Sequence, residues 1–220
     1  VIGVMNYMEG LIPAPKSNYG AAYDIAAPGQ KIISAAKSGE TEPYCTKDGT
    51  SMATPFVSFA AAVLEIRFNR KSATVYDVMT STPAVATGTV SYGNGVYTAK
   101  KLNLSAFVEF KHIKEIKVFT EDESLDALII FCPGDSKGSF ASVAVVDAIS
   151  YVKDLAAQNK TIVINMSLTN MIRSSNTSSW GKNGAIDVMI QSAVREGVIV
   201  CAAAGNKGYN SASSGYSLGS

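Results

Sequence analysis

Histidine is almost absent from this sequence and occurs once in 220 residues, at His112. The chain therefore offers a single candidate for a histidine acid or base. The stretch Phe110–Lys117 around it alternates apolar and charged side chains, as a half-buried strand does. No glycine stands beside His112, and no helical pattern follows it. We therefore interpret His112 as a solvent-facing strand residue and assign it no catalytic role.

Cysteine is also scarce, with three residues at Cys45, Cys132 and Cys201. Their spacing fits neither a zinc site nor a dense disulfide framework, so the sequence indicates no metal centre and no identifiable cofactor. Cys201 lies in an apolar, strand-like run and is expected to be a small buried hydrophobe. The odd number leaves at least one thiol without a partner in the chain. The redox compartment and the disulfide state stay open.

An excess of charge of either sign is missing, because 19 basic and 18 acidic residues give a net charge of +1. This balance implies no nucleic-acid or anionic-membrane partner. No apolar run is long enough to span a membrane. The chain begins with Val1 rather than methionine, which leaves open that a signal peptide or propeptide has been removed.

The sequence does contain an alternation of strand-like and helix-like segments, with 47% hydrophobic residues. Short apolar, β-branched runs suit strands that are covered on both faces. This alternation predicts an α/β fold with three layers, in which helices flank a mostly parallel sheet. The expected strands are Val1–Val4, Lys31–Ser34, Leu128–Phe131, Thr161–Met166 and Val198–Ala202. The expected helices are Thr50–Asn69, Thr74–Ser81, Ser139–Gln158 and Gly184–Glu196.

The most informative stretch is Asp48–Leu64, in which a small, flexible turn leads into a long apolar helix. Ser51 stands at the opening of that helix, where free backbone N–H groups and the helix dipole favour negative charge. An alkoxide or an oxyanion would be stabilised there. Pro55 is expected in the first turn, where an N–H has no intrahelical acceptor in any case. A serine that only caps a core helix would not require the whole string around it.

Residues Gly49–Pro55 read Gly-Thr-Ser-Met-Ala-Thr-Pro. This string resembles, residue for residue, the nucleophile motif of the subtilisin-like serine proteases, the subtilases. The resemblance implies a subtilisin-like fold, Ser51 as the nucleophile and a polypeptide as the substrate or bound ligand. It also favours a secreted or cell-surface location. Subtilases commonly bind structural calcium, but we can assign no ligand set to this sequence.

A second part of the chain carries the same resemblance. Thr161–Leu168 looks like the family strand that lines the substrate cleft, and Val198–Asn206 looks like the strand and turn that present the oxyanion-hole asparagine. A side-chain amide N–H can donate to the developing oxyanion, so the resemblance gives Asn206 that role. The alternative for Asn206 is a turn residue in the left-handed conformation. By the same resemblance, the substrate-binding residues are Thr50, Ser167, Leu168, Thr169 and Gly205.

Two motifs of the family are missing. Family aspartates sit in Asp-Thr-Gly or Asp-Ser-Gly turns and family histidines in His-Gly-Thr-His, and neither string occurs. Asp24 resembles a structural strand–turn residue shortly before the nucleophile motif. Asp126 resembles a polar residue of a strand that enters the sheet. The triad Asp and His would therefore come from a missing segment or from a partner chain.

One departure from the family lies within the nucleophile helix. The family often has glycine at the position of Phe59. A large side chain there is expected to crowd a helix that packs close to the sheet.

The matching segments stand in permuted order. In the family the oxyanion asparagine precedes the nucleophile, whereas here Asn206 follows Ser51. We therefore divide the chain into a C-terminal-type part of a subtilase core at 1–106, a poorly readable connector at 107–123 and a middle part of a core at 124–220. Three explanations stay open: a circular permutation, a slice across two tandem units, or an incomplete sequence.

Two functions from different classes follow from these residues. The first is a serine endopeptidase that hydrolyses peptide bonds through an acyl-enzyme on Ser51. The second is a catalytically incomplete pseudoprotease or fragment that acts as a peptide-binding or scaffold module. The second arises because a serine hydroxyl without a neighbouring base stays protonated at neutral pH.

Overall fold

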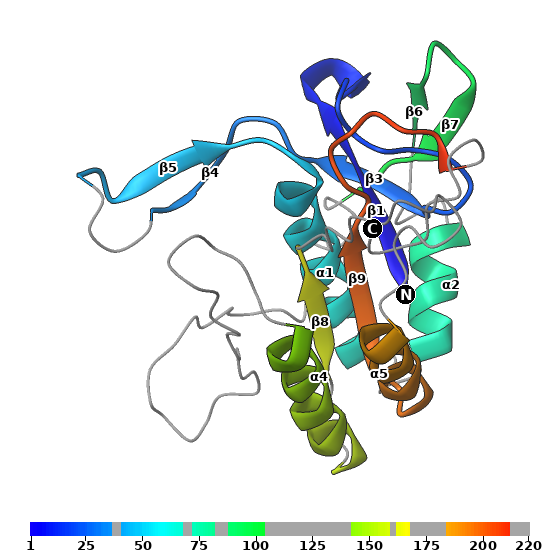
Figure 1. Ribbon diagram of the computed structural model, residues 1–220. Coiled ribbons are helices and arrows are strands. Elements are labelled where there is room, and N and C mark those ends of the chain that lie inside the picture. Colours follow the sequence, from blue (N-terminus) through cyan, green and yellow to red (C-terminus); the bar gives the residue numbers. More distant parts are fainter. Residues whose placement is uncertain are drawn as a thin grey trace.

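A mostly parallel sheet forms the centre of the protein in its computed structural model (Figure 1). The structure describes residues 1–36, 41–67, 72–81, 88–103, 142–158, 162–167 and 184–211. The sheet has the strand order β3–β1–β9–β8, and each neighbouring pair in that order is parallel. The short β2 pairs antiparallel with the end of β1. The strands are β1, Ile2–Met8; β2, Ile12–Pro13; β3, Ile25–Pro28; β8, Val163–Met166; and β9, Ile199–Ala203.

The centre of the sheet brings together residues from opposite ends of the sequence. β1 pairs with β9, with Ile2 opposite Cys201 and Val4 opposite Ala203. β9 also pairs with β8 on its other side. The start of the chain therefore lies directly beside the strand that leads into Asn206.

The apolar runs of the strands explain why helices cover both faces of the sheet. In β9, Ile199 and Cys201 belong to the core on one face, whereas Val200 and Ala202 belong to the core on the other. Successive side chains of a strand point to opposite faces, so a continuous apolar strand must be covered twice. All residues of β9 are buried. The prediction of a buried strand at Val198–Ala202 is confirmed with a shift of one residue.

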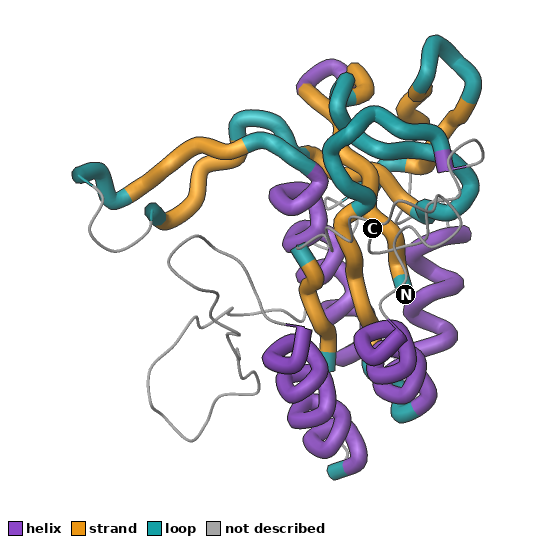
Figure 2. The backbone as a smooth tube through the Cα atoms, in the orientation of Figure 1, coloured by secondary structure: helices purple, strands orange, loops and turns teal. Residues whose placement is uncertain are grey.

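Helices form the two outer layers (Figures 1 and 2). The α-helices of the described residues are α1, Thr50–Arg67; α2, Ser72–Ser81; α4, Ser142–Ala157; and α5, Gly184–Arg195. α1 and α2 contribute to the core on one face, and α4 and α5 to the core on the other. Ala53, Ala60 and Ala61 are fully buried on α1, and their small side chains allow a close approach to the sheet. The predicted three-layer α/β fold is confirmed.

The predicted sheet strand at Lys31–Ser34 is wrong in its placement. The segment forms β4, Ile32–Ala35, which pairs antiparallel with β5, Tyr44–Lys47, in a hairpin that projects from the body (Figure 1). Ile33 is 72% exposed and Tyr44 is 67% exposed. The apolar run is too short for its periodicity to distinguish a core strand from the arm of a hairpin.

A second hairpin precedes residue 101, in a stretch for which no strand was predicted. It joins β6, Thr89–Tyr92, to β7, Tyr97–Lys100. Val90 and Tyr92 are buried in a small core that also contains Met5 of β1. This hairpin therefore packs on the sheet rather than extending from it. The predicted strand Leu128–Phe131 lies outside the described residues.

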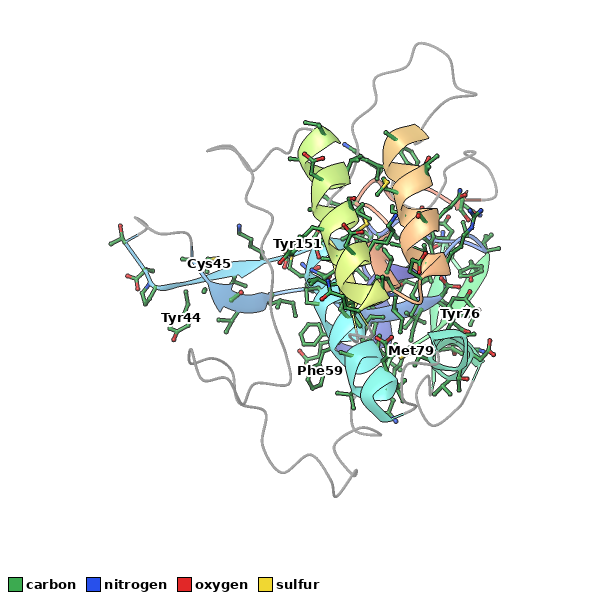
Figure 3. All side chains as sticks on the ribbon, turned by 90° about the horizontal axis from the view of Figure 1, so that it is seen from below. Tyr44, Cys45, Phe59, Tyr76, Met79 and Tyr151 are labelled. Carbon is green, nitrogen blue, oxygen red and sulfur yellow. The ribbon has the colours of Figure 1, made fainter. Side chains whose placement is uncertain are left out.

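Phe59 does not crowd α1 against the sheet. Its side chain, labelled in Figure 3, is 43% exposed, whereas its neighbours Ala60 and Ala61 are fully buried. Each residue turns the helix by about 100°, so Phe59 lies off the face that packs on the sheet. The expectation of crowding was based on the residue type and is wrong in this setting.

Cys45 and Cys201 are expected to react very differently with an alkylating reagent. Burial in β9 raises the pKa of the Cys201 thiol to about 12, so very little of this thiol is a reactive thiolate at pH 8. Cys45 lies on the projecting hairpin and is partly exposed (Figure 3). We expect iodoacetamide at pH 8 to modify Cys45 in the folded protein and Cys201 only after denaturation. Peptide mass spectrometry would measure both, and equal modification before unfolding would contradict the buried placement of Cys201.

Candidate active site

Ser51 lies in the first turn of α1, directly after a bend at Gly49. The Gly49 carbonyl accepts hydrogen bonds from the N–H groups of Met52, at 3.0 Å, and Ala53, at 3.3 Å, so the helix begins there. Gly49 has a φ of +139°, a conformation that residues with a side chain rarely adopt. The first N–H groups of a helix have no intrahelical acceptor, and the helix dipole favours negative charge beside them. The half-buried Ser51 is thus placed where an oxyanion would be stabilised.

A second glycine holds the Gly49 bend in position. The Gly49 N–H donates to the Gly29 carbonyl at 2.7 Å, and the Asn6 side-chain amide donates to the same carbonyl at 3.3 Å. A Cβ atom on Gly29 would lie 2.5 Å from the Gly49 oxygen and 2.6 Å from Asn6 Oδ1. Such distances are too short for any side chain, so only glycine allows this approach. The turn after β3 therefore sets the position of the bend that leads into Ser51.

Asn206 lies against the same bend, although 156 residues separate it from Thr50. Its Oδ1 atom accepts hydrogen bonds from the Thr50 N–H, at 2.9 Å, and from the Thr50 hydroxyl, at 3.2 Å. The Thr50 hydroxyl in turn accepts a hydrogen bond from the Gly205 N–H at 3.0 Å. Because the amide oxygen is engaged by Thr50, the amide nitrogen of the exposed Asn206 is the end that can donate elsewhere.

Ser167, directly after β8, is joined to the first turn of α1 by a hydrogen bond. Pro55 is the sixth residue of α1, so its expected place in the first turn is wrong. Proline has no N–H and leaves the Ser51 carbonyl without its usual intrahelical donor. The Ser167 hydroxyl donates to that carbonyl at 2.8 Å. This bond satisfies the acceptor and places Ser167 beside Ser51.

Thr50 and Gly205 are both buried, unlike Asn206. Their hydrogen bonds connect the N-terminus of α1 to the turn after β9. The structure therefore brings four predicted site residues into one neighbourhood: Thr50, Ser51, Gly205 and Asn206. Ser167 adds a fifth. The predicted substrate contacts Leu168 and Thr169 lie outside the described residues and stay predictions.

Asp24, which was weighed as a candidate acidic residue, is held by contacts outside this neighbourhood. Asp24 accepts hydrogen bonds from the Gly3 N–H, at 2.7 Å, and from the Tyr76 hydroxyl, at 2.8 Å. Burial, followed by the contact with Asp24, raises the pKa of Tyr76 to about 12. Asp24 thus connects β1 to α2, which fits the structural role predicted for it. His112 and Asp126 lie outside the described residues.

The described ranges contain neither a candidate metal site nor a candidate membrane-spanning helix. Within those ranges, no group of three or more His, Cys, Asp or Glu side chains is arranged to hold a metal ion. No described helix combines the length and the apolar character needed to cross a bilayer. The expectation of structural calcium stays a prediction from the family resemblance.

One residue beside the site was not indicated by any sequence pattern. Asn18 stands in the string Ser-Asn-Tyr-Gly at 17–20, which has the composition of an ordinary turn. In the structure its side chain contacts the turn that carries Asn206. A polar residue at 2% exposure is unusual, but burial cannot be read from so short a polar string.

The fold and this neighbourhood define a three-layer α/β protein with a serine and an asparagine amide at the N-terminus of a core helix. The chain belongs to the subtilase family, whose pattern it matches over residues 1–101 and 123–220. The first matched range contains Ser51, and the second contains Asn206.

Two curated relatives are extracellular proteases by name. The chain is 41% identical over 69 residues to an extracellular protease of Xanthomonas campestris pv. campestris, an alignment that covers 30% of the chain and 12% of the relative. It is 49% identical over 55 residues to an extracellular basic protease of Dichelobacter nodosus, covering 23% of the chain and 9% of the relative. The matches thus span a small part of each relative.

Proposed function

We propose that this chain carries the nucleophile and the oxyanion donor of a subtilisin-like serine endopeptidase. The observation that supports this proposal most is the pair of hydrogen bonds from Thr50 to Asn206 Oδ1. They hold an amide donor beside Ser51 across 156 residues of sequence. A helix-capping serine alone would need no such partner. Membership of the subtilase family supports the same assignment.

In the proposed reaction the Ser51 Oγ atom attacks the carbonyl carbon of the scissile peptide bond. The carbonyl oxygen becomes an oxyanion, which receives hydrogen bonds from the Asn206 Nδ2 and from the Ser51 backbone N–H. Collapse of this intermediate releases the amine half of the substrate and leaves an acyl-enzyme on Ser51, which water then hydrolyses. The proton of the Ser51 hydroxyl must pass to a base, and the triad His and Asp would come from a missing segment or a partner chain.

The end of β8 is the proposed binding place for an extended peptide. Ser167 is tied to the Ser51 carbonyl at 2.8 Å, so the chain that follows β8 starts beside the nucleophile. Within the described sheet β8 is the last strand, and its outer edge is not paired with another described strand. An unpaired strand edge can receive a peptide through main-chain hydrogen bonds. Leu168, Thr169 and Gly205 would complete the contacts with the substrate.

The second candidate is a peptide-binding or scaffold module that keeps the fold without the chemistry. One observation favours it: the single histidine of the chain, His112, stands in a strand-like segment rather than in the family histidine motif. A subtilase core without its base would keep the edge of β8 and the Asn206 amide. It would therefore still bind extended peptides without cleaving them.

A fluorophosphonate probe separates these two functions. If a base reaches Ser51, the purified chain is expected to be labelled at least about 1,000-fold faster than the Ser51→Ala variant, because loss of triad members in subtilisin itself costs about 10⁴- to 10⁶-fold. Ser91→Ala, which changes an exposed serine of β6, is the control and should be labelled like the unchanged chain. Mass spectrometry of the modified peptide would identify the serine.

The absence of labelling in a folded sample would contradict the endopeptidase function for this chain alone. In that case, binding of an extended peptide should still be measurable by calorimetry. Binding that persists in Ser51→Ala would support the peptide-binding module.

A further inference from the structure

The loop after β2 runs beside the turn that follows β9. The Asn18 N–H donates to the Gly205 carbonyl at 2.9 Å, and the Gly208 N–H donates to the Lys16 carbonyl at 2.8 Å. Further along, the Tyr19 N–H donates to the Tyr209 carbonyl at 2.8 Å. These bonds join two segments that lie nearly the whole chain apart in sequence. The turn that carries Asn206 is therefore supported by a neighbouring loop as well as by its own strand.

The side chain of Asn18 adds three hydrogen bonds between these segments. Its Nδ2 atom donates to the Ala204 carbonyl at 2.8 Å. Its Oδ1 atom accepts from the N–H groups of Lys207, at 3.1 Å, and Tyr209, at 3.0 Å. The three backbone groups lie on both sides of Asn206 in the sequence. One buried carboxamide thus bridges the turn from the residue before Gly205 to the residues after Asn206.

Asparagine is the side chain that fits this position. The bridge needs a donor for the Ala204 carbonyl and an acceptor for two N–H groups, which a carboxamide combines at the right size. Aspartate would keep the acceptor but would set a buried negative charge against the Ala204 oxygen. An aliphatic residue would leave all three backbone groups without their partner, and Asn18 is only 2% exposed.

Asn18 is itself held firmly to the sheet. Its carbonyl accepts a hydrogen bond from the Ser17 hydroxyl at 2.9 Å, and that hydroxyl accepts one from the Asn6 N–H of β1 at 2.9 Å. Ser17 and Asn6 are both buried. The support of the turn therefore extends from Asn206 through Asn18 to the central strand of the sheet.

We propose that Asn18 is a positioning residue for Asn206, because its buried carboxamide fixes the turn from which the Asn206 amide reaches the Ser51 bend. Thr50 holds the side chain of Asn206, and Asn18 holds the main chain of residues on either side of Asn206. The effect on catalysis rests on the proposed function, in which Asn206 is the oxyanion donor. The effect on the turn does not depend on it.

The first test measures the hydrogen bonds of the turn and does not depend on catalytic activity. In Asn18→Ala, amide hydrogen exchange followed by nitrogen-15 NMR should be at least about 10-fold faster at Lys207 and Tyr209, because each N–H loses its acceptor. Val75→Ala in α2 is the matched control: it weakens the core that α1 and α2 share on one face of the sheet and should not single out these two amides. The side-chain amide signals of Asn206 should also shift in Asn18→Ala alone.

A second variant keeps the test valid if Asn18→Ala folds poorly. Asn18→Asp keeps an acceptor for Lys207 and Tyr209 and removes the donor to Ala204. Its amides at 207 and 209 should stay protected while the Asn206 side-chain signals shift. Exchange at Lys207 and Tyr209 in Asn18→Ala that matches the Val75→Ala control would overturn the proposal, and so would unshifted Asn206 side-chain signals in Asn18→Asp.

The second test connects the turn to the chemistry. Asn18→Ala should slow fluorophosphonate labelling of Ser51 by about 10- to 100-fold, since a displaced catalytic group typically costs up to about 100-fold. In an Asn206→Ala background the same change should have no further effect, because Asn18 acts through Asn206. Equal slowing in both backgrounds would overturn the positioning role. If the unchanged chain is not labelled, the proposed function fails for this chain, and the exchange and side-chain signals alone decide the positioning role.

Discussion

Asn206→Ala is expected to slow the labelling of Ser51 by a fluorophosphonate by about 100- to 1,000-fold. The magnitude is that known for the loss of one oxyanion-hole donor in subtilisin itself, and it is an expectation for this chain. Alanine removes both the Nδ2 donor and the Oδ1 atom that Thr50 binds at 2.9 Å. The bond to Thr50 holds the Nδ2 donor in position before the reaction. A water molecule in its place would not be held in this way, so it would not restore the rate. The rate of labelling, measured by intact mass spectrometry over time, checks the prediction.

Asn206→Asp removes the Nδ2 donor of residue 206 but keeps an oxygen that Thr50 can bind. The carboxylate keeps an acceptor for the Thr50 N–H but has no N–H of its own, and its charge opposes the developing oxyanion. We expect it to slow labelling at least as much as Asn206→Ala while preserving the bend. Asn94→Gly changes an exposed asparagine in the turn between β6 and β7 and serves as the control. Full labelling in Asn206→Asp would show that the amide donor takes no part.

Gly49→Ala is expected to cause the second large effect, a loss of about 100-fold in the labelling rate. A Cβ atom at this position would lie 3.0 Å from Asn206 Nδ2 and 3.2 Å from its Oδ1. The residue would also have to adopt a φ of +139°, which costs about 1–3 kcal/mol for a residue with a side chain. We therefore expect the Asn206 amide to move away from Ser51 in a protein that remains folded.

Gly95→Ala is the matched control for Gly49→Ala. Gly95 has a φ of +89°, but a Cβ atom there would meet nothing within 4 Å. Its backbone strain should lower the melting temperature to a similar extent without slowing the labelling. Equal labelling rates in the two variants would contradict the role of the Gly49–Asn206 contact.

The local parts of the fold could be predicted because their signals are local. A continuous apolar run at Val198–Ala202 predicts a strand covered on both faces, and the structure confirms it. The apolar segment that begins at Thr50 predicts a long core helix, and the structure confirms this as well. The short run at Lys31–Ser34 carried too little periodicity, and its placement in the sheet was wrong.

The sequence by itself determined the class of fold and the family motif at Gly49–Pro55, because periodicity and a seven-residue motif depend only on neighbouring residues. It did not determine what holds the site together. The bonds from Thr50 to Asn206 span 156 residues and the bond from Asn18 to Ala204 spans 186. Likewise, the Ser51 carbonyl cannot receive a hydrogen bond from Pro55, which has no N–H. It receives one from the Ser167 hydroxyl, 116 residues away in sequence. Only the tertiary structure decides such pairings, because a buried polar group is satisfied by whichever partner the packing of the sheet brings within reach.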